Sequence, residues 1–287
     1  MLLLRHQFKL PEIGAAFAQD ELRSEELVVC NTVFEGGKFD QVRGLPAGQR
    51  HRWSKAVIVL EGHLLARGAL LRPGDLIISR DWDDYPMRAL EERTHYLLLS
   101  WRHGMAGDRP SSSGVIRDAR TLAGARSLAQ RLRDRQGTLW LQHALGALTR
   151  SLAWLGAGIN EEAAREGPSD DPRHLAVAQA LEASLFPLKG QPMVVDFSAA
   201  LGTGERQTQR LLADYFRRFY VTAPGWRQFV YGMRLEVGVF LASNRRATTE
   251  ILARALGFAS SGALCHAFHR AGLPSPQGVR SALSMGK

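Results

Sequence analysis

The chain has 287 residues, of which 45% are hydrophobic and 23% charged, and this composition excludes intrinsic disorder. Its length is sufficient for two domains, each with its own hydrophobic core. The two cysteines, Cys30 and Cys265, lie far apart, which argues against a disulfide framework or a cysteine-rich zinc site and favours a reducing cytoplasm. No stretch approaches the roughly 18 consecutive apolar residues of a membrane-spanning helix, and the apolar N-terminal run is too short for a signal peptide. We therefore expect a cytoplasmic protein without membrane contact.

Positive charge is concentrated in the C-terminal part of the chain. The formal net charge is +9, and residues 172–287 hold 14 Lys and Arg against 6 Asp and Glu, whereas residues 1–171 hold 23 against 22. Such an asymmetry is typical of a nucleic-acid-binding domain, although a basic solvated surface would give the same count.

Short strands are expected in residues 1–103. Apolar runs at 56–60, 63–66, 76–78 and 94–101 are separated by turns at Gly62, Gly68 and Pro73-Gly74-Asp75. Turn residues at this regular spacing predict a small antiparallel barrel or a jelly roll.

Residues 104–171 predict a linker, two helices and a second linker. The first linker, 104–117, is rich in Gly, Ser and Pro. One amphipathic helix begins near Asp118 and another spans 139–155. The glycine-rich, acidic segment 156–172 is expected to connect two domains.

Residues 172–287 predict an all-α domain with two helix-turn-helix units. In the first unit, 194–201 and 205 to about 220 form helices around Gly202-Thr203-Gly204. On the second of these helices, five residues are expected to face inward: Thr208, Leu211, Leu212, Tyr215 and Phe219. Four are expected to face outward: Arg206, Arg210, Ala213 and Arg217. Arginine on such a face can donate two hydrogen bonds to guanine or neutralise phosphate, and Gln207 and Gln209 suit adenine.

The second unit follows a long helix at 225–242. A short helix containing Ile251 and Leu252 ends at Gly257, where a left-handed backbone is easily adopted. Ser260 or Ser261 is a suitable N-cap for the next helix. Leu264, Ala267, Phe268 and Ala271 face inward on that helix. Five residues face outward: Ser261, Gly262, Cys265, His266 and His269.

This C-terminal pattern resembles the DNA-binding signature of the AraC/XylS family of bacterial transcription regulators. The matching positions are Arg234-Leu235-Glu236, Ala253, Gly257-Phe258, Phe268, Arg270, Pro276 and Arg280. So many matches over about fifty residues are more specific than a lone helix-turn-helix pattern. Gly204 departs from the family, in which serine or threonine usually caps the helix.

The resemblance implies a sequence-specific transcription regulator that binds double-stranded DNA. Its two recognition helices would enter successive major grooves, one helical turn apart. The residues expected to contact DNA are Arg206, Gln207, Gln209, Arg210, Arg217, Ser260, Ser261, Gly262, His266, His269 and Arg270. The arginine-rich first helix is expected to bind more strongly than the chemically mild second one.

The resemblance also implies a cupin-like sensor domain at residues 1–103, giving an α+β protein overall. A small-molecule effector could be bound by Arg52, Trp53, Arg80, Trp82 and Tyr85, or these could be ordinary surface residues. The helices after the barrel often make the dimer contact in this family, so we expect a homodimer, unless they pack only on their own barrel. For an activator, RNA polymerase is a further expected partner.

A metal-dependent cupin enzyme with an appended helical interaction domain is the main alternative. It needs clustered histidines, but His51, His63 and His95 are scattered and no His-X-His pair occurs in this region. We therefore expect no catalytic residues, no metal and no cofactor. A third possibility is a regulator without ligand, controlled by a partner protein.

Overall fold

A computed structural model of the chain describes residues 2–38, 53–79, 87–102, 114–135, 138–159, 161–165, 171–185, 193–219 and 225–284. The strands precede the long helices in the chain, which confirms the α+β class. The strands are β1 (Leu2–Leu10), β2 (Ala15–Arg23), β3 (Leu27–Glu35), β4 (Trp53–Glu61), β5 (Leu64–Ala66), β6 (Ala69–Leu71), β7 (Asp75–Ser79), β8 (Met87–Ala89), β9 (Arg93–Arg102) and β10 (Ile116–Arg117). The last of these lies within the segment 104–117 that the sequence predicted as a linker.

The strands form two antiparallel sheets. A seven-stranded sheet has the order β1-β2-β3-β9-β4-β7-β10, and a three-stranded sheet has the order β6-β5-β8. Buried residues of both, such as Val57 and Leu64, share one apolar core. Among the described strands no hydrogen-bonded ladder joins the two sheets, which therefore form two packed layers, an arrangement that a jelly roll also has. Barrel closure would need a continuous ladder.

Successive side chains of a strand point to opposite faces of the sheet, and in the large sheet both faces carry apolar side chains. Both faces are therefore covered by helices or by the other sheet. We call the face with Leu4 and Phe8 the inner face and the face with Leu22 and Val29 the outer face. The outer face packs against α1 (Ala119–Arg133) and α2 (Thr138–Trp154). Asp118 caps α1 by accepting a hydrogen bond from the Thr121 amide at 2.7 Å.

Part of the segment expected as an interdomain linker belongs to this outer core. Ala157, Ile159 and Ala164 are buried against α1 and α2, and a short 3-10 helix spans Ala163–Arg165. Burial of three apolar side chains fixes these residues in place, which the glycine content of the segment did not predict.

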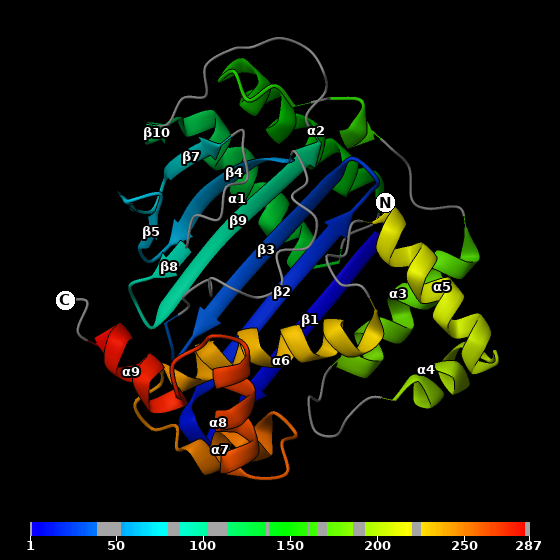
Figure 1. The fold of residues 1–287 in the computed structure, drawn as a ribbon. Helices are drawn as coiled ribbons and strands as arrows, with labels where there is room; N and C mark the ends of the chain where they lie inside the picture. The colour runs from blue at the N-terminus through cyan, green and yellow to red at the C-terminus, as the bar shows by residue number, and fades with distance from the viewer. Residues whose placement is uncertain are drawn as a thin grey trace.

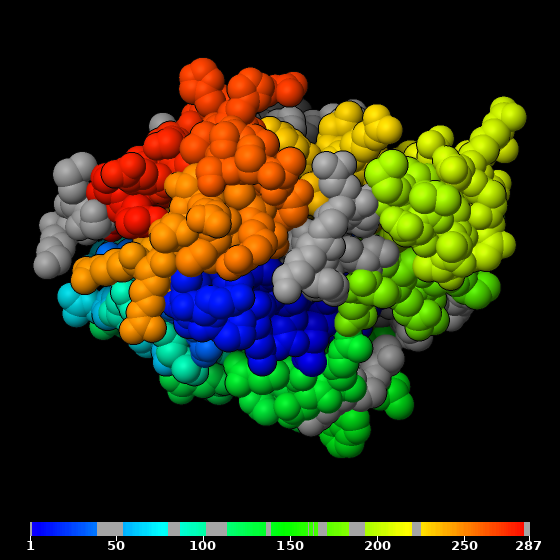
Figure 2. All heavy atoms as spheres, turned by 90° about the horizontal axis from the view of Figure 1, so that it is seen from below, coloured from blue at the N-terminus to red at the C-terminus, as the bar shows by residue number. Residues whose placement is uncertain are grey.

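The inner face is covered by the C-terminal helices. These are α3 (Pro172–Leu185), α4 (Val194–Leu201), α5 (Glu205–Arg218), α6 (Trp226–Ala242), α7 (Thr249–Ala255), α8 (Ser261–Arg270) and α9 (Pro276–Ser284). Helix α6 crosses in front of β1, β2 and β3 (Figure 1). The N-terminal strands, in blue, therefore lie between a layer containing α6–α9 and a layer containing α1 and α2 (Figure 2).

The two ends of this helical layer meet the sheet differently. Val177 and Leu181 of α3 pack on Leu2 and Leu4, and this cluster extends into α4 and α5. At the other end, Phe240 of α6 joins the main core and its ring lies 5.1 Å from that of Phe34.

Two further expectations concern the ligand pocket and membrane-spanning helices. Arg52, Arg80, Trp82 and Tyr85, which were expected to line a ligand pocket, lie outside the described residues, as does the side chain of Trp53. No helix in the described ranges has both the length and the apolar character that crossing a bilayer requires.

Candidate nucleic-acid interface

Helices α4 and α5 form the first helix pair, and the turn between them has the geometry that the sequence predicted. Gly202 ends α4 with φ of 62°, a left-handed conformation that glycine adopts at little cost. Gly204 is the N-cap of α5 and provides no side-chain hydrogen bond. Thr208, Leu212 and Tyr215 are buried, so the predicted inward face is confirmed.

The outward face of α5 is polar and basic. Its exposed residues are Arg206, Gln207, Gln209, Arg210, Ala213 and Arg217. Arg206 and Arg210 form no ion pair with any residue in the described ranges, so both guanidinium groups remain open to an external anion. They are one helical turn apart, which places both charges on the same side.

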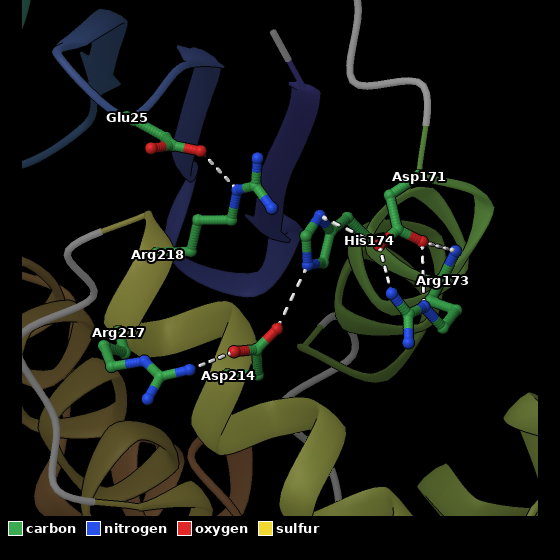
Figure 3. A network of polar contacts seen from close by, with 7 residues as sticks. All are labelled: Glu25, Asp171, Arg173, His174, Asp214, Arg217 and Arg218. Carbon is green, nitrogen blue, oxygen red and sulfur yellow. Dashed lines mark hydrogen bonds and ion pairs between the residues drawn. The ribbon is translucent and has the colours of Figure 1, made fainter.

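Arg217 is less available, because it is held by a neighbour on its own helix. It forms an ion pair with Asp214, and Asp214 also contacts Nε2 of His174 on α3 at 3.3 Å (Figure 3). The hydrogen bond from His174, helped by Arg217, lowers the pKa of Asp214. Asp214 is therefore charged at neutral pH and keeps Arg217 partly neutralised.

The end of α5 is attached to the sheet. Nη1 of Arg23 donates to the carbonyl oxygen of Phe219 at 3.2 Å, and Nε of Arg218 lies 2.5 Å from a carboxylate oxygen of Glu25 (Figure 3). The periodicity of α5 gave no reason to single out Arg218 or Glu25. Their pairing depends on the tertiary arrangement, so it left no signal in the spacing of residues.

Helices α7 and α8 form the second helix pair, which is capped at both N-termini. Oγ1 of Thr248 accepts from the Ile251 amide at 3.2 Å, and Oγ of Ser260 accepts from the Ala263 amide at 3.1 Å. This settles Ser260 as the N-cap over Ser261. Gly257 has φ of 70°, as predicted for the turn.

The outward face of α8 is chemically mild, as predicted. Ser260, Gly262, His266, His269 and Arg270 are exposed, whereas Ser261 and Cys265 are half-buried. Leu264, Ala267 and Phe268 face the core.

Several of the family-like positions build the scaffold of the second pair. The guanidinium of Arg280 on α9 donates to the carbonyl oxygen of Ala242, the last residue of α6, and to that of Ala247 in the connection to α7. Arg234 is buried, with its guanidinium 5.9 Å from the centre of the Phe258 ring. Gly238 allows close approach, because a Cβ there would lie 3.0 Å from the Phe268 ring.

Among the described side chains, no three His, Cys, Asp or Glu residues gather as ligands for a metal ion. His63 instead pairs with Glu91, and Nε2 of His95 contacts Oδ1 of Asn31 at 2.7 Å. Each imidazole therefore has a protein partner.

No protein-family profile and no curated protein matches the chain. Solved structures resemble it remotely. A putative glyoxylate-induced protein from Pseudomonas aeruginosa is 14% identical with a TM-score of 0.30 over 39% of this chain; the chain spans 44% of that protein, less than half its length. ToxT from Vibrio cholerae O395 is 9% identical with a TM-score of 0.38, over 92% of this chain and 100% of its own. The AraC-like transcriptional activator CuxR is 14% identical with a TM-score of 0.31, over 77% and 80%. At this level of similarity, function has to be inferred from the chain's own residues.

Proposed function

We propose that this chain is a sequence-specific DNA-binding transcription regulator and not an enzyme. Two short helix pairs, α4–α5 and α7–α8, lie at either end of α6, and this observation carries the proposal. On α5, Arg206 and Arg210 are exposed and form no ion pair within the described part of the chain. Each pair is a helix-turn-helix unit in this interpretation, and α5 and α8 are the recognition helices.

The two recognition helices bind successive major grooves on one face of the DNA. This requires a separation of about 34 Å, or about 10 base pairs. Arg206 and Arg210 supply guanine contacts or phosphate neutralisation, and Gln207 and Gln209 supply adenine contacts. Because charge dominates, affinity falls steeply with salt.

The regulator acts as a homodimer that pairs through α2. Trp140 and Trp154 are 61% and 86% exposed and lie two heptads apart on that helix, with Ala147 midway between them. Large apolar side chains exposed in line are typical of a protein interface. A small effector and, for activation, RNA polymerase complete the expected partners.

The test is to select fragments that the full-length protein retains from a genomic library and to titrate them by fluorescence anisotropy. We expect the selected fragments to share a motif of two recognised stretches, whose centres lie about 10 base pairs apart on one face of the duplex. Affinity should fall as salt is raised from ~50 to ~200 mM. Equal affinity for selected fragments and random duplex would refute sequence-specific binding.

A further inference from the structure

The outer face of the sheet is not fully covered by α1 and α2. Beyond the C-terminal end of α1, strands β1, β2, β3 and β9 enclose an open hollow of about 300 Å³. This volume is at the lower end of the range of small-molecule sites. The hollow lies on the side of the sheet opposite the helix pairs, so it is separate from the candidate DNA interface.

Strand register explains the shape of the hollow. Lys9 pairs with Ala16 and Gln7 pairs with Ala18, so long side chains on β1 stand beside two methyl groups on β2. Ala18 in turn pairs with Val33 on β3. Because side chains alternate across a strand, these residues share one face and leave a low apolar floor between polar walls.

One wall of the hollow is formed by a chain of hydrogen bonds between buried or half-buried side chains. Nε of Arg5 donates to Asp20 at 2.6 Å, and Nδ2 of Asn31 donates to the other oxygen of Asp20 at 3.2 Å. Asp20 and Asn31 are 5% and 2% exposed, so this wall is fixed. Arg5 also donates to the carbonyl oxygen of Arg133, which ties the wall to the end of α1.

His95 lines the hollow, and its hydrogen bond to Asn31 determines which of its ring nitrogens is an acceptor. The amide nitrogen of Asn31 is the donor to Asp20, so its Oδ1 is an acceptor and Nε2 of His95 must donate to it. Burial, with the charge of Arg133 adding to it, lowers the pKa of His95 to about 4. At neutral pH the ring is uncharged, and its Nδ1 carries a lone pair.

Two of the cations that line the hollow form no ion pair within the described ranges. Arg93 pairs with Glu35 at 3.0 Å and with Glu61 at 2.8 Å, and Arg5 pairs with Asp20. Lys9 and Arg133 are exposed and form no ion pair with any residue that the structure describes. Both line the hollow, Lys9 from β1 and Arg133 from the end of α1.

We propose that this hollow binds a small hydroxylated organic anion, of the size of a sugar acid. Its carboxylate lies between Lys9 and Arg133, a hydroxyl group donates to Nδ1 of His95, and its carbon skeleton covers the floor at Ala16 and Ala18. An apolar floor with a few convergent polar groups is the usual composition of a small-molecule site.

The experiment is calorimetric titration of the full-length protein, without DNA, with three probes. Gluconate has both the carboxylate and the hydroxyl groups, glucose lacks the charge, and hexanoate lacks the hydroxyl groups. We expect gluconate to bind at least about tenfold more tightly than either of the others, the ratio that one lost charge-assisted hydrogen bond would give. Undetectable gluconate binding at ~10 mM, or equal binding of either other probe, would overturn the proposal.

Variants locate the site. The double change Lys9→Gln with Arg133→Gln should weaken gluconate binding at least about tenfold, whereas Arg126→Gln, an exposed residue elsewhere on α1, should leave it unchanged. Ala18→Leu should also weaken binding, because its side chain would fill the floor. Undiminished binding in the double variant and in Ala18→Leu, with unchanged thermal unfolding, would place the ligand elsewhere. DNA affinity is measured separately, so either proposal can fail without the other.

Discussion

The two helix pairs, α4–α5 and α7–α8, have the same helix-turn-helix arrangement but differ in capping, in burial and in charge. The second pair has side-chain caps at Thr248 and Ser260, and Phe268 connects it to the core that fills the space between the sheets. In the first pair, α5 starts at Gly204, which provides no side-chain cap. The apolar residues of this pair form a separate cluster, in which Leu2 and Leu4 are the sheet residues among those the structure describes. The first pair nevertheless carries Arg206 and Arg210, which form no ion pair among the residues that the structure describes. Charge for binding and rigidity for support are thus located in different pairs.

Core truncation should give the largest difference between the pairs. Phe268→Ala is expected to lower the free energy of unfolding by about 3–5 kcal/mol, because the ring is fully buried in the main core. Leu212→Ala in α5 should cost about 2–5 kcal/mol but mainly loosen the first pair. Urea unfolding followed by hydrogen exchange measures both. If the amides of α5 and α8 exchange as one cooperative unit in both variants, the two clusters are not separate.

The next largest effect concerns DNA. Arg210→Ala should lose roughly 1–3 kcal/mol of binding free energy and flatten the salt slope by about one unit, because Arg210 is exposed and has no ion-pair partner in the described ranges. His266→Ala on α8 should lose less, because an imidazole cannot donate the two parallel hydrogen bonds that arginine makes to guanine. Titrations at two salt concentrations measure the ranking. Equal losses would mean that the mild helix contributes as much as the basic one.

Substitutions at the helix N-caps test the same difference between the two pairs, with smaller expected changes in stability. Ser260→Ala should cost about 1 kcal/mol, because its hydroxyl caps α8. Gly204→Ser should instead stabilise by a few tenths of a kcal/mol, since the backbone there is extended and a Cβ meets no atom within 4 Å. Thermal unfolding of both variants measures the two signs. A destabilised Gly204→Ser variant would contradict the view that α5 lacks only a cap.

The sequence predicted local structure well and tertiary structure only in outline. The bounds of α4, Val194–Leu201, and the caps around Gly257 followed from periodicity and turn chemistry. The pairing of Arg218 with Glu25 did not, because nearly two hundred residues separate them. The hollow near His95 was missed for the same reason: it exists only because β9 pairs with β3, and strand order is not encoded in spacing. Turn spacing could not decide between a barrel and a jelly roll, since it does not specify closure.

The smallest effect concerns the contact that restrains Arg217. Asp214 has a lowered pKa, so its contribution to stability is present above its unfolded pKa, about 4, and is lost as pH falls through the folded value. Asp214→Asn should therefore cost less than about 1 kcal/mol at neutral pH, because the carboxylate is 45% exposed, and nothing in strong acid.

The same substitution should strengthen DNA binding by releasing Arg217 from its ion pair. The matched control is Glu205→Gln on the same helix, which removes one negative charge but frees no arginine. Asp214→Asn should thus raise affinity and steepen the salt slope more than Glu205→Gln, because a further cation then reaches phosphate. If the two variants gain equally, simple loss of negative charge explains the gain, and Arg217 is not restrained in the free protein. The basic face of α5 would then include all three arginines from the outset, and its contrast with α8 would be larger than the unpaired Arg206 and Arg210 alone imply.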